Sequence, residues 1–326
     1  MPENSKILVT GGGGYIGSHT CKALADCGYM PIAFDNLSTG HRDFVKWGPL
    51  EVGDIRDYFR LEEVIKKYRP NAAIHFAASA YVGESVSNPL KYYENNIFGS
   101  TVLIKALTSN NINQLVFSSS CATYGIPKVD KINEDCEQKP INPYGFSKFA
   151  VEQCLRDVAV SSNLRFVSLR YFNAAGADSD GEIGEKHDPE THLIPLAIKS
   201  AMGMGKLKVY GTDFDTPDGS AVRDYTHVSD LASAHLLALQ YLEGHGKSTA
   251  VNLGTGKGTS VLQVINGVKK IFGNIEYEVD GRREGDPAYL VADSDLAKNL
   301  LGWTPKYQSI ESILMDAVNW HKKNGF

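Results

Sequence analysis

A tyrosine and a lysine at the start of an expected helix are the residues of this chain best suited to acid–base chemistry. The stretch NPYGFSKFAVEQCL, residues 142–155, opens with a proline, which suits the first turn of a helix. Tyr144 and Lys148 are four positions apart, so a helix places them on one face. A phenol has too high a pKa to act as a base at neutral pH, so a neighbouring lysine ammonium and a positively charged cofactor must together favour its phenolate. A surface tyrosine packed on a lysine stem gives the same pattern, so the pair needs a cofactor beside it.

A glycine-rich turn near the N-terminus predicts a dinucleotide site. The stretch KILVTGGGGYIGSHT places Gly11, Gly14 and Gly17 directly after an expected strand and at the start of an expected helix. These glycines allow a tight turn, the approach of the backbone to a pyrophosphate, and close packing of the helix on the strand. Asp35 ends the next strand, 24 positions after Gly11. Its carboxylate can accept hydrogen bonds from ribose hydroxyls and repels a 2′-phosphate, which favours NAD over NADP.

Three consecutive serines complete this set. Ser118, Ser119 and Ser120, in FSSSCATYG, lie at the carboxyl end of another expected strand. Ligands of open α/β sheets bind at that edge, so we expect a serine, Tyr144 and Lys148 to converge beside the nicotinamide. Polar residues that cap a strand are the alternative interpretation of the serines.

The elements that position these residues follow from alternating apolar runs and helical patterns. Strands are expected near 6–9, 31–34, 72–76, 114–119 and 165–170, and helices near 17–27, 57–68, 89–109 and from 143. Strand, helix, strand predicts a parallel sheet. Asp54, in VGDIRD, ends a further extended run and is either a partner of the adenine amino group or a helix N-cap.

The second half of the chain has a different texture. Beyond Tyr171 the sequence is rich in Gly and Asp, with helices expected near 192–203, 229–242, 260–272 and 308–323. The predicted fold is α/β, with a Rossmann-type doubly wound parallel sheet and a smaller C-terminal substrate-binding α/β domain. The expected domains are an NAD-binding domain, 1–176, and a smaller substrate-binding domain, 177–326. The segment around 222–255 is a candidate to return to the first domain.

Composition narrows the classes of partner. The 326 residues are 42% hydrophobic with a formal charge of -5 and no basic run, so neither nucleic acid nor a membrane is an expected partner. No signal pattern or long apolar run occurs, and we expect a cytoplasmic protein. Five cysteines without a CxxC pair indicate reduced thiols. Nine histidines lack metal-ligand spacing, His187 and His192 being five apart and poorly placed for one helix face, so no metal site is predicted.

Over essentially its whole length the chain resembles the UDP-glucose 4-epimerase (UDP-galactose 4-epimerase) family of the extended short-chain dehydrogenase/reductase superfamily. The resemblance rests on VTGGGGYIGSHT, VGDIRD, HFAASAYVGES, YYENN, SSSCATYG, PYGFSK, LRYFNAAGA, VRDYTHVSDLA, NLGTGKG and RREGD. It implies an isomerase that interconverts UDP-glucose and UDP-galactose at C4 through a transient 4-keto sugar, with enzyme-bound NAD. It also implies a homodimer, in which the helix near 89–109 and the helix from 143 pair between subunits.

The resemblance also implies roles for individual residues. Tyr144 would be base and acid, assisted by Ser120 and Lys148. NAD would be lined by Gly11, Gly14, Tyr15, Ile16, Gly17, Asp35, Asn36, Asp54, Ile55, Phe76, Ala77, Ala78, Ser79, Ala80, Asn95, Ser118, Tyr144, Lys148 and Phe172. The UDP-sugar would be bound by Ser120, Tyr144, Asn173, His192, Leu193, Lys208, Val209, Tyr210, Arg223, Arg283, Asp286 and Leu290.

The two arginines also have local explanations. Arg223 can pair with the neighbouring Asp224, and Arg283 with Glu284 or Asp286. Two guanidinium groups nevertheless suit a diphosphate, because they form paired, charge-assisted hydrogen bonds.

Two departures from the family pattern keep other activities open. Ala80 stands where many relatives carry lysine, and Leu290 stands at the position that gates the sugar pocket. Leu290 and AYVGES are similar to UDP-xylose/UDP-arabinose 4-epimerases, which gives an alternative substrate. A nucleotide-sugar 4,6-dehydratase would need an Asp-Glu pair where Cys121 and Ala122 follow Ser120. A non-catalytic NAD-sensing protein would not need the serine, tyrosine and lysine together.

Overall fold

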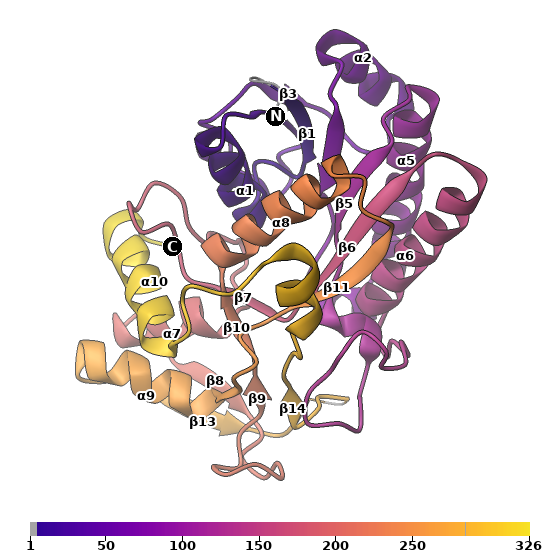
Figure 1. Cartoon of the computed structure of the whole chain (residues 1–326). Coiled ribbons are helices and arrows are strands. Elements are labelled where there is room, and N and C mark those ends of the chain that lie inside the picture. Colours follow the sequence, from indigo (N-terminus) through magenta and orange to yellow (C-terminus); the bar gives the residue numbers. More distant parts are fainter. Residues whose placement is uncertain (1–4, 284) are drawn as a thin grey trace.

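A parallel sheet forms the centre of the molecule (Figure 1). The computed structural model describes residues 5–283 and 285–326. The sheet has seven strands, in the order β11-β6-β5-β4-β1-β2-β3. They are β1 (Lys6–Thr10), β2 (Met30–Asp35), β3 (Leu50–Val52), β4 (Ala72–His75), β5 (Gln114–Ser118), β6 (Arg165–Tyr171) and β11 (Thr249–Leu253). This is a doubly wound order whose direction reverses at β1, and it confirms the predicted fold class.

Helices cover both faces of the sheet, because its strands are buried on both sides. On one face lie α1 (Tyr15–Asp26) and α8 (Val228–Glu243). On the other lie α2 (Tyr58–Tyr68), α5 (Gly99–Ser109) and α6 (Pro143–Ser161), as Figure 1 shows. Each face has its own hydrophobic cluster, one containing Leu24 and Leu239 and the other containing Leu61, Leu103 and Leu155.

The helix expected near 89–109 is built from three parts. It consists of α4 (Pro89–Tyr92), a π-helical turn η2 (Tyr93–Phe98) and α5. Short helices outside the predicted set are η1 (Arg42–Phe44), α3 (Val82–Ser87), η3 (Cys121–Tyr124) and η4 (Ala297–Leu301). Single π-turns occur often at functional sites, and η2 carries Asn95 from the predicted cofactor set.

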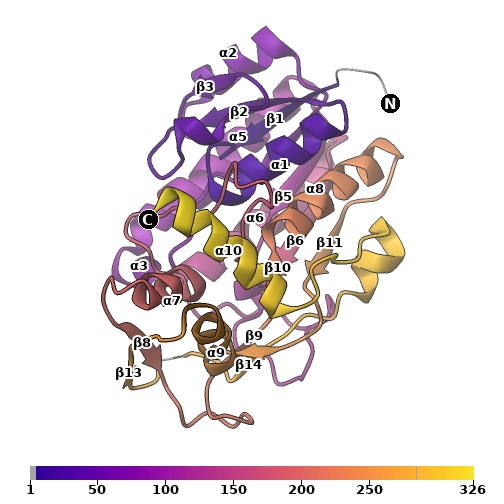
Figure 2. The same cartoon turned by 90° about the vertical axis from the view of Figure 1, so that its left-hand side faces the viewer.

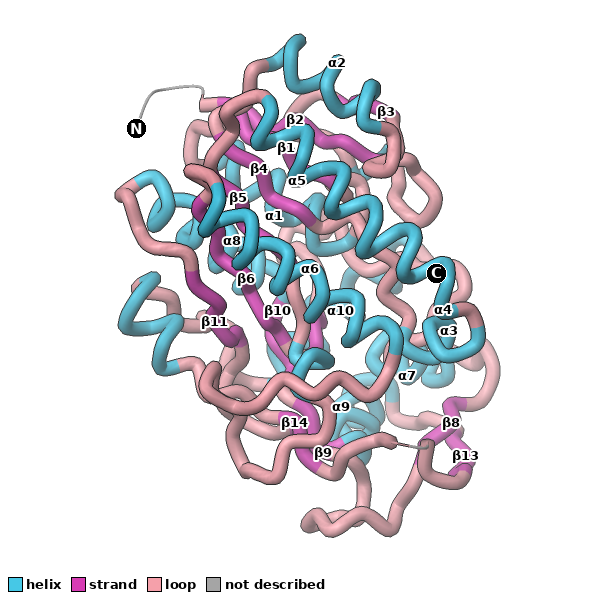
Figure 3. The backbone as a smooth tube through the Cα atoms, turned by 90° about the vertical axis from the view of Figure 1, so that its right-hand side faces the viewer, coloured by secondary structure: helices cyan, strands magenta, loops and turns pink. Residues whose placement is uncertain are grey.

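The helices and small strands built from residues 193–223 and 259–290 lie at the end of the molecule far from α2 (Figures 2 and 3). Three helices, α7 (Leu193–Ala201), α9 (Val261–Phe272) and α10 (Ile310–Asn324), share a third hydrophobic cluster. Small sheets pair β7 (Asn173–Ala175) with β10 (Tyr225–His227), β8 (Leu207–Tyr210) with β13 (Tyr277–Asp280), and β9 (Val222–Arg223) with both β12 (Thr259–Ser260) and β14 (Tyr289–Leu290). The four helices expected here are present with shifts of one or two residues.

Two elements from the second half lie with the N-terminal sheet. β11 pairs with β6 from Thr249↔Val167 to Leu253↔Tyr171, and α8 shares a hydrophobic cluster with α1. The division into an NAD-binding domain, 1–176, and a nucleotide-sugar-binding domain, 177–326, stays a proposal, in which β11 and α8 return to the first unit. All five cysteines are free thiols. Among the described residues, no helix combines the length and the apolar character that a membrane span requires.

Candidate active site

The turn between β1 and α1 leaves the first turn of α1 open. Gly11 has a φ of +75°, and a Cβ added there would lie 2.6 Å from the backbone nitrogen of Ala77. A Cβ on Gly17 would lie 2.1 Å from the carbonyl oxygen of Gly11. At Gly14, the N-cap, the nearest atom would be 3.3 Å away, and no side chain caps the helix. Gly11 and Gly17 therefore serve the turn and the packing, while Gly14 leaves free N–H groups of the kind that bind a pyrophosphate.

Asp35 lies beside this turn at the carboxyl end of β2. Its Oδ2 accepts a hydrogen bond from the Gly13 N–H at 2.9 Å, and its Oδ1 accepts one from the Leu37 N–H at 2.8 Å. Burial raises the pKa of the Asp35 carboxyl, although these two bonds oppose the rise. The backbone of the glycine turn thus holds the carboxylate in the position expected for a ribose partner.

Asp54 and Asn36 lie next to Asp35 and contact each other. The Asn36 amide donates to Asp54 Oδ2 at 3.0 Å, and the Arg56 guanidinium donates to both Asp54 oxygens at 2.8 and 2.7 Å. The N-cap alternative for Asp54 is wrong, because Asp57 caps α2 by accepting from the Arg60 N–H at 3.0 Å. The role of Asp54 as a partner of the adenine amino group stays a prediction, and its two oxygens accept from Arg56 and Asn36 in this structure.

The end of β5 and the start of α6 bring the predicted catalytic residues together. Asn142 caps α6, accepting from the Gly145 N–H at 2.8 Å, and this cap fixes Tyr144 in the first turn. The Lys148 ammonium donates to the Ser118 carbonyl oxygen at 2.6 Å and lies 5.9 Å from the ring centroid of Tyr144. Ser120 lies close enough to the Tyr144 phenol for its hydroxyl to lower the pKa of that phenol.

Gly145 is the residue that allows this approach. A Cβ at position 145 would lie 2.4 Å from the carbonyl oxygen of Ala122, in the turn that follows Ser120. Any larger residue must push α6 away from that turn. Sequence reasoning missed this role, although the glycine stands directly after Tyr144 in PYGFSK.

Burial controls the pKa values of Tyr144 and Lys148 in the chain without cofactor. Burial is the main cause that raises the pKa of Tyr144, and the neighbouring Tyr171 raises it further, while the Ser120 hydroxyl opposes the rise. Burial also lowers the pKa of Lys148 to about 7, against the attraction of Glu152. The expectation that Lys148 and the positive nicotinamide ring together favour the Tyr144 phenolate stays a prediction. A usable phenolate needs further positive charge at this place.

Two buried polar residues, which sequence reasoning missed, hold the elements that carry the catalytic residues in place. Asn96, in η2, accepts from the Ser79 N–H at 2.8 Å and donates to the Ser147 hydroxyl at 3.0 Å, which ties the turn after β4 to α6. Glu152, one turn beyond Lys148, accepts from the Ser119 hydroxyl and from the Arg170 guanidinium at 2.5 and 2.6 Å. Asn96 stands next to the predicted Asn95 in YYENN, but nothing in the local sequence marks Glu152 as buried.

The other residues expected to line NAD surround the same edge of the sheet. The Tyr15 hydroxyl donates to the Gly176 carbonyl oxygen at 2.6 Å. Ile55 and Phe172 are buried in separate hydrophobic clusters, Phe172 in the one that contains Cys121. Ile16, Phe76, Ala77, Ala78 and Ser79 are partly buried, whereas Ala80 is exposed.

Arg223 and Leu290 stand in register on paired strands, β9 and β14. The Arg223 guanidinium pairs with the Asp286 carboxylate and donates to the Pro287 carbonyl oxygen at 2.9 Å. The local alternative, a pair with Asp224, is wrong, because the Asp224 carboxylate accepts instead from backbone N–H groups of 255, 256 and 292. Leu290 packs on the cluster of Cys121 and Phe172, which brings the predicted gate next to the residues that follow Ser120.

The expected uracil site is brought together in part. The Arg283 guanidinium lies 3.9 Å from the ring centroid of Tyr210. The half-exposed side chain of Lys208 has its Nζ 3.7 Å from Glu278 Oε1. The side chain of Val209 is buried in a hydrophobic cluster. These two side chains therefore have contacts outside the pair of Arg283 and Tyr210. The alternative pair of Arg283 with Glu284 lies outside the described residues.

Asn173 and His192 begin two neighbouring elements. The Asn173 N–H donates to the Asp224 carbonyl oxygen at 3.0 Å, so the start of β7 is held beside β9. His192 is the N-cap residue of α7 and contacts Glu185 through Nδ1, and Leu193 is the partly buried first residue of the helix.

Known proteins match this chain over nearly its full length. A model of the NAD dependent epimerase/dehydratase family matches residues 7–254. The UDP-glucose 4-epimerase of Rhizobium leguminosarum bv. trifolii is 53% identical over 320 residues, which are 98% of this chain and 98% of that protein. The crystal structure of UDP-glucose 4-epimerase from Brucella ovis in complex with NAD has a TM-score of 0.95 and 51% identity, covering 97% of this chain and 98% of that one.

A second solved structure contains a nucleotide as well. It is UDP-glucose 4-epimerase from Bifidobacterium longum in complex with NAD+ and UDP, with a TM-score of 0.93 and 39% identity, covering 98% of this chain and 100% of that one. These matches confirm the resemblance inferred from the sequence motifs. The chain therefore belongs to the NAD dependent epimerase/dehydratase family and, within it, to the UDP-glucose 4-epimerase family.

Proposed function

We propose that this protein is an NAD-dependent isomerase that interconverts UDP-glucose and UDP-galactose by inverting C4. The observation that carries the proposal is the cluster of Ser120, Tyr144 and Lys148 at the carboxyl end of β5, on the same sheet edge as the open glycine turn. Relatives named UDP-glucose 4-epimerase, at 53% and 52% identity, support the same substrate. The donor set fits NAD, because Gly14 leaves helix N–H groups open and Asp35 lies beside them.

The catalytic residues have separate tasks in this proposal. Bound NAD supplies a reversible hydride acceptor. Tyr144 takes the proton of the sugar 4-hydroxyl and later returns one, and Ser120 holds the sugar oxygen and the phenol in one hydrogen-bond chain. Lys148 is held against β5 through the Ser118 carbonyl oxygen, which leaves its ammonium at a fixed distance from the phenol. Together with the positive ring of the cofactor, this ammonium opposes the burial that otherwise keeps Tyr144 protonated.

The sugar nucleotide would lie between this cluster and β9. Arg223 provides a guanidinium that suits a diphosphate, and Asp286 holds it until the ligand arrives. Tyr210 and Arg283 would hold the uracil, with Asn173, His192 and Leu193 along the path between uracil and sugar. Leu290 would contact the sugar itself, because it packs on the same cluster as Cys121.

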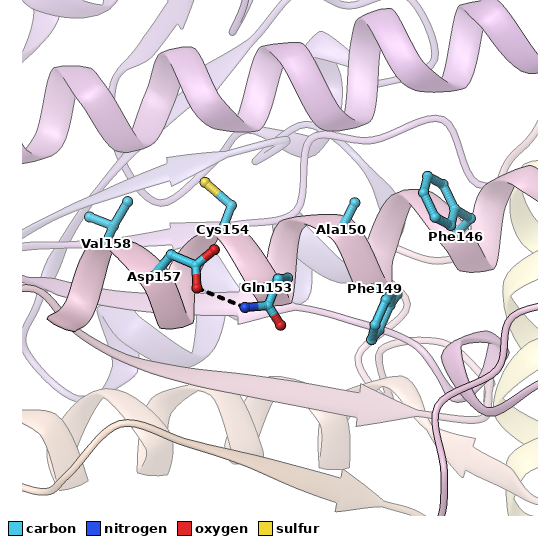
Figure 4. Close-up of a pocket in the computed structure, with 7 residues that line it drawn as sticks. All are labelled: Phe146, Phe149, Ala150, Gln153, Cys154, Asp157 and Val158. Atoms are coloured by element: carbon cyan, nitrogen blue, oxygen red, sulfur yellow. Dashed lines mark hydrogen bonds between the residues drawn. The ribbon is translucent and has the colours of Figure 1, made fainter. Parts of the chain in front are cut away.

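We also propose a homodimer through α5 and α6. Figure 4 shows Phe146, Ala150, Cys154 and Val158 following one another along one side of α6, with Gln153 and Asp157 hydrogen-bonded at 2.7 Å beside them. A second copy of the chain is the occupant we propose, because family resemblance pairs these same helices between subunits. Exposed apolar side chains continue the surface, Phe98 being 55% and Phe146 44% exposed.

The test is conversion of UDP-galactose by the purified protein, with the dinucleotide content measured after denaturation. We expect bound NAD and formation of UDP-glucose, without a 4-keto-6-deoxy product. Tyr144→Phe should lower kcat by about 10²–10⁴-fold while NAD stays bound. Tyr58→Phe, which removes a hydroxyl on α2 far from the cluster, is the matched control and should keep normal turnover. A dehydrated product, or full activity of Tyr144→Phe with an intact fold, would contradict the proposal.

A further inference from the structure

The loop before α7 brings two histidines and two glutamates together. Glu185, His187, Glu190 and His192 each offer one ligand atom, and these atoms all lie within 4.8 Å of one another. Nδ1 of His187 lies 3.4 Å from Glu185 Oε1 and 3.6 Å from Glu190 Oε2. Nδ1 of His192 contacts Glu185 Oε1 and lies 3.9 Å from Glu190 Oε1. The spacing of His187 and His192 is poor for placing both on one helix face, but in this loop it brings both imidazoles to one place.

Two carboxylates and an unpartnered imidazole nitrogen face one another in this cluster. Nδ1 of His187 is buried and has no hydrogen-bond partner among the described residues. Within the residues that the structure describes, no lysine or arginine forms an ion pair with Glu185 or Glu190. This imidazole nitrogen therefore faces two carboxylates that no lysine or arginine neutralises within the described part of the chain.

A neighbouring acidic cluster shows the contrast. Asp178, Asp180 and Glu182 also lie within ligand distance of one another. Their cation is already present, because the Lys22 ammonium contacts them at 2.9, 2.9 and 2.8 Å. An acidic cluster that is satisfied by lysine gives no reason to expect a metal.

We propose that Glu185, His187, Glu190 and His192 form a binding site for a divalent transition-metal ion such as Zn²⁺. Two imidazole nitrogens and two carboxylate oxygens are a suitable ligand set for Zn²⁺, which takes four ligands in structural sites. Oxygen-seeking Mg²⁺ and Ca²⁺ are disfavoured, because half of the donors are nitrogen.

The site links parts of the molecule that are distant in sequence. The ring of His187 makes edge contacts with Tyr15, which follows the glycine turn, at 6.3 Å and with Tyr81 at 5.9 Å between centroids. Glu185 is anchored through its carbonyl oxygen, which accepts from the Trp320 indole at 3.0 Å. A metal held here fixes the loop against the glycine turn and orients the His192 ring through Nδ1. Nε2 of His192, on a side chain that is 48% exposed, stays free for another ligand.

Metal binding can be measured without substrate, so its failure is distinguishable from failure of the epimerase proposal. Full-length protein is dialysed against EDTA and then titrated with Zn²⁺ by calorimetry. We expect one Zn²⁺ per chain, and His187→Ala and Glu185→Gln should each weaken binding by at least about tenfold. The matched control is His245→Asn, because His245 is exposed, lies outside the cluster and has a φ of 64° that asparagine accepts.

A second measurement does not depend on variants that fold. Co²⁺ added to the EDTA-treated wild type should give the visible absorption of a four-coordinate ion, and Zn²⁺ should abolish it. Absence of both Zn²⁺ binding at micromolar metal and the Co²⁺ signal would overturn the proposal. Equal binding by wild type, His187→Ala and His245→Asn would overturn it as well, because the metal would then bind elsewhere.

Discussion

Gly145→Ala tests whether close contact between α6 and the turn after Ser120 sets the catalytic geometry. The added Cβ would lie 2.4 Å from the Ala122 carbonyl oxygen. Atoms in ordinary contact are about 3.4 Å apart, so the helix and the turn must separate by roughly 1 Å. This movement carries Tyr144 away from Ser120. A misplacement of about 1 Å can cost about 10²-fold in rate, which is about 2.7 kcal/mol in the barrier.

The assay compares kcat for UDP-galactose, bound NAD and thermal unfolding between wild type and variant. We expect the loss in kcat with NAD retained, and a stability cost of about 1–3 kcal/mol from overpacking. Gly83→Ala is the matched control, because Gly83 is helical and a Cβ there meets nothing within 4 Å. If Gly145→Ala turns over within twofold of wild type, the contact is not what sets the geometry, and the reasoning is refuted.

Three further perturbations test the surroundings of the site. Glu152→Ala leaves the Arg170 guanidinium buried without its carboxylate, and should lower the free energy of unfolding by about 3–5 kcal/mol. Urea titrations measure this loss, and adding Arg170→Met should recover part of it. An unchanged urea midpoint for Glu152→Ala would contradict this prediction. Because folding lowers the pKa of Lys148 to about 7, the folded chain binds fewer protons than the unfolded chain between pH 7 and the ordinary lysine pKa. Wild type should therefore gain stability relative to Lys148→Met when the pH rises from 7 to 9 at constant cofactor content, and a constant difference would count against the burial effect. Ala150→Glu should convert a dimer to a monomer in light scattering while Phe59→Glu on α2 does not, and a monomeric wild type at micromolar concentration would rule the dimer out.

The sequence predicted the features that depend on local pattern. The glycine turn, Asp35 and the helix with Tyr144 and Lys148 each combine a motif with a neighbouring strand or helix signal, so the doubly wound fold and the position of the catalytic cluster could be predicted. Prediction was poorer wherever the outcome depends on burial. The pKa of Tyr144 rises because the phenol is buried, and no spacing rule contains that quantity.

Contacts between segments that are distant in sequence could not be predicted either. Arg223 has Asp224 beside it in sequence, yet the structure pairs it with Asp286, 63 positions away. The carboxylate of Asp224 is instead held by backbone N–H groups of a remote turn. The spacing of His187 and His192 is poor for metal binding on one helix face, but the two residues lie in a loop. The path of that loop is set by buried Glu185 and Trp320. Such partners follow from the tertiary fold, which no local pattern contains.

The pairing of β11 with β6 has a consequence for how the chain matures. The last strand of this sheet to be synthesised is β11 (Thr249–Leu253), which follows residue 176 by more than 70 positions. Until then β6 presents an unpaired strand edge, and such edges template association with other chains. A fragment that stops at residue 176 keeps this edge permanently and should aggregate. Completion of the sheet by β11 therefore couples the folding of the first half to synthesis of the second.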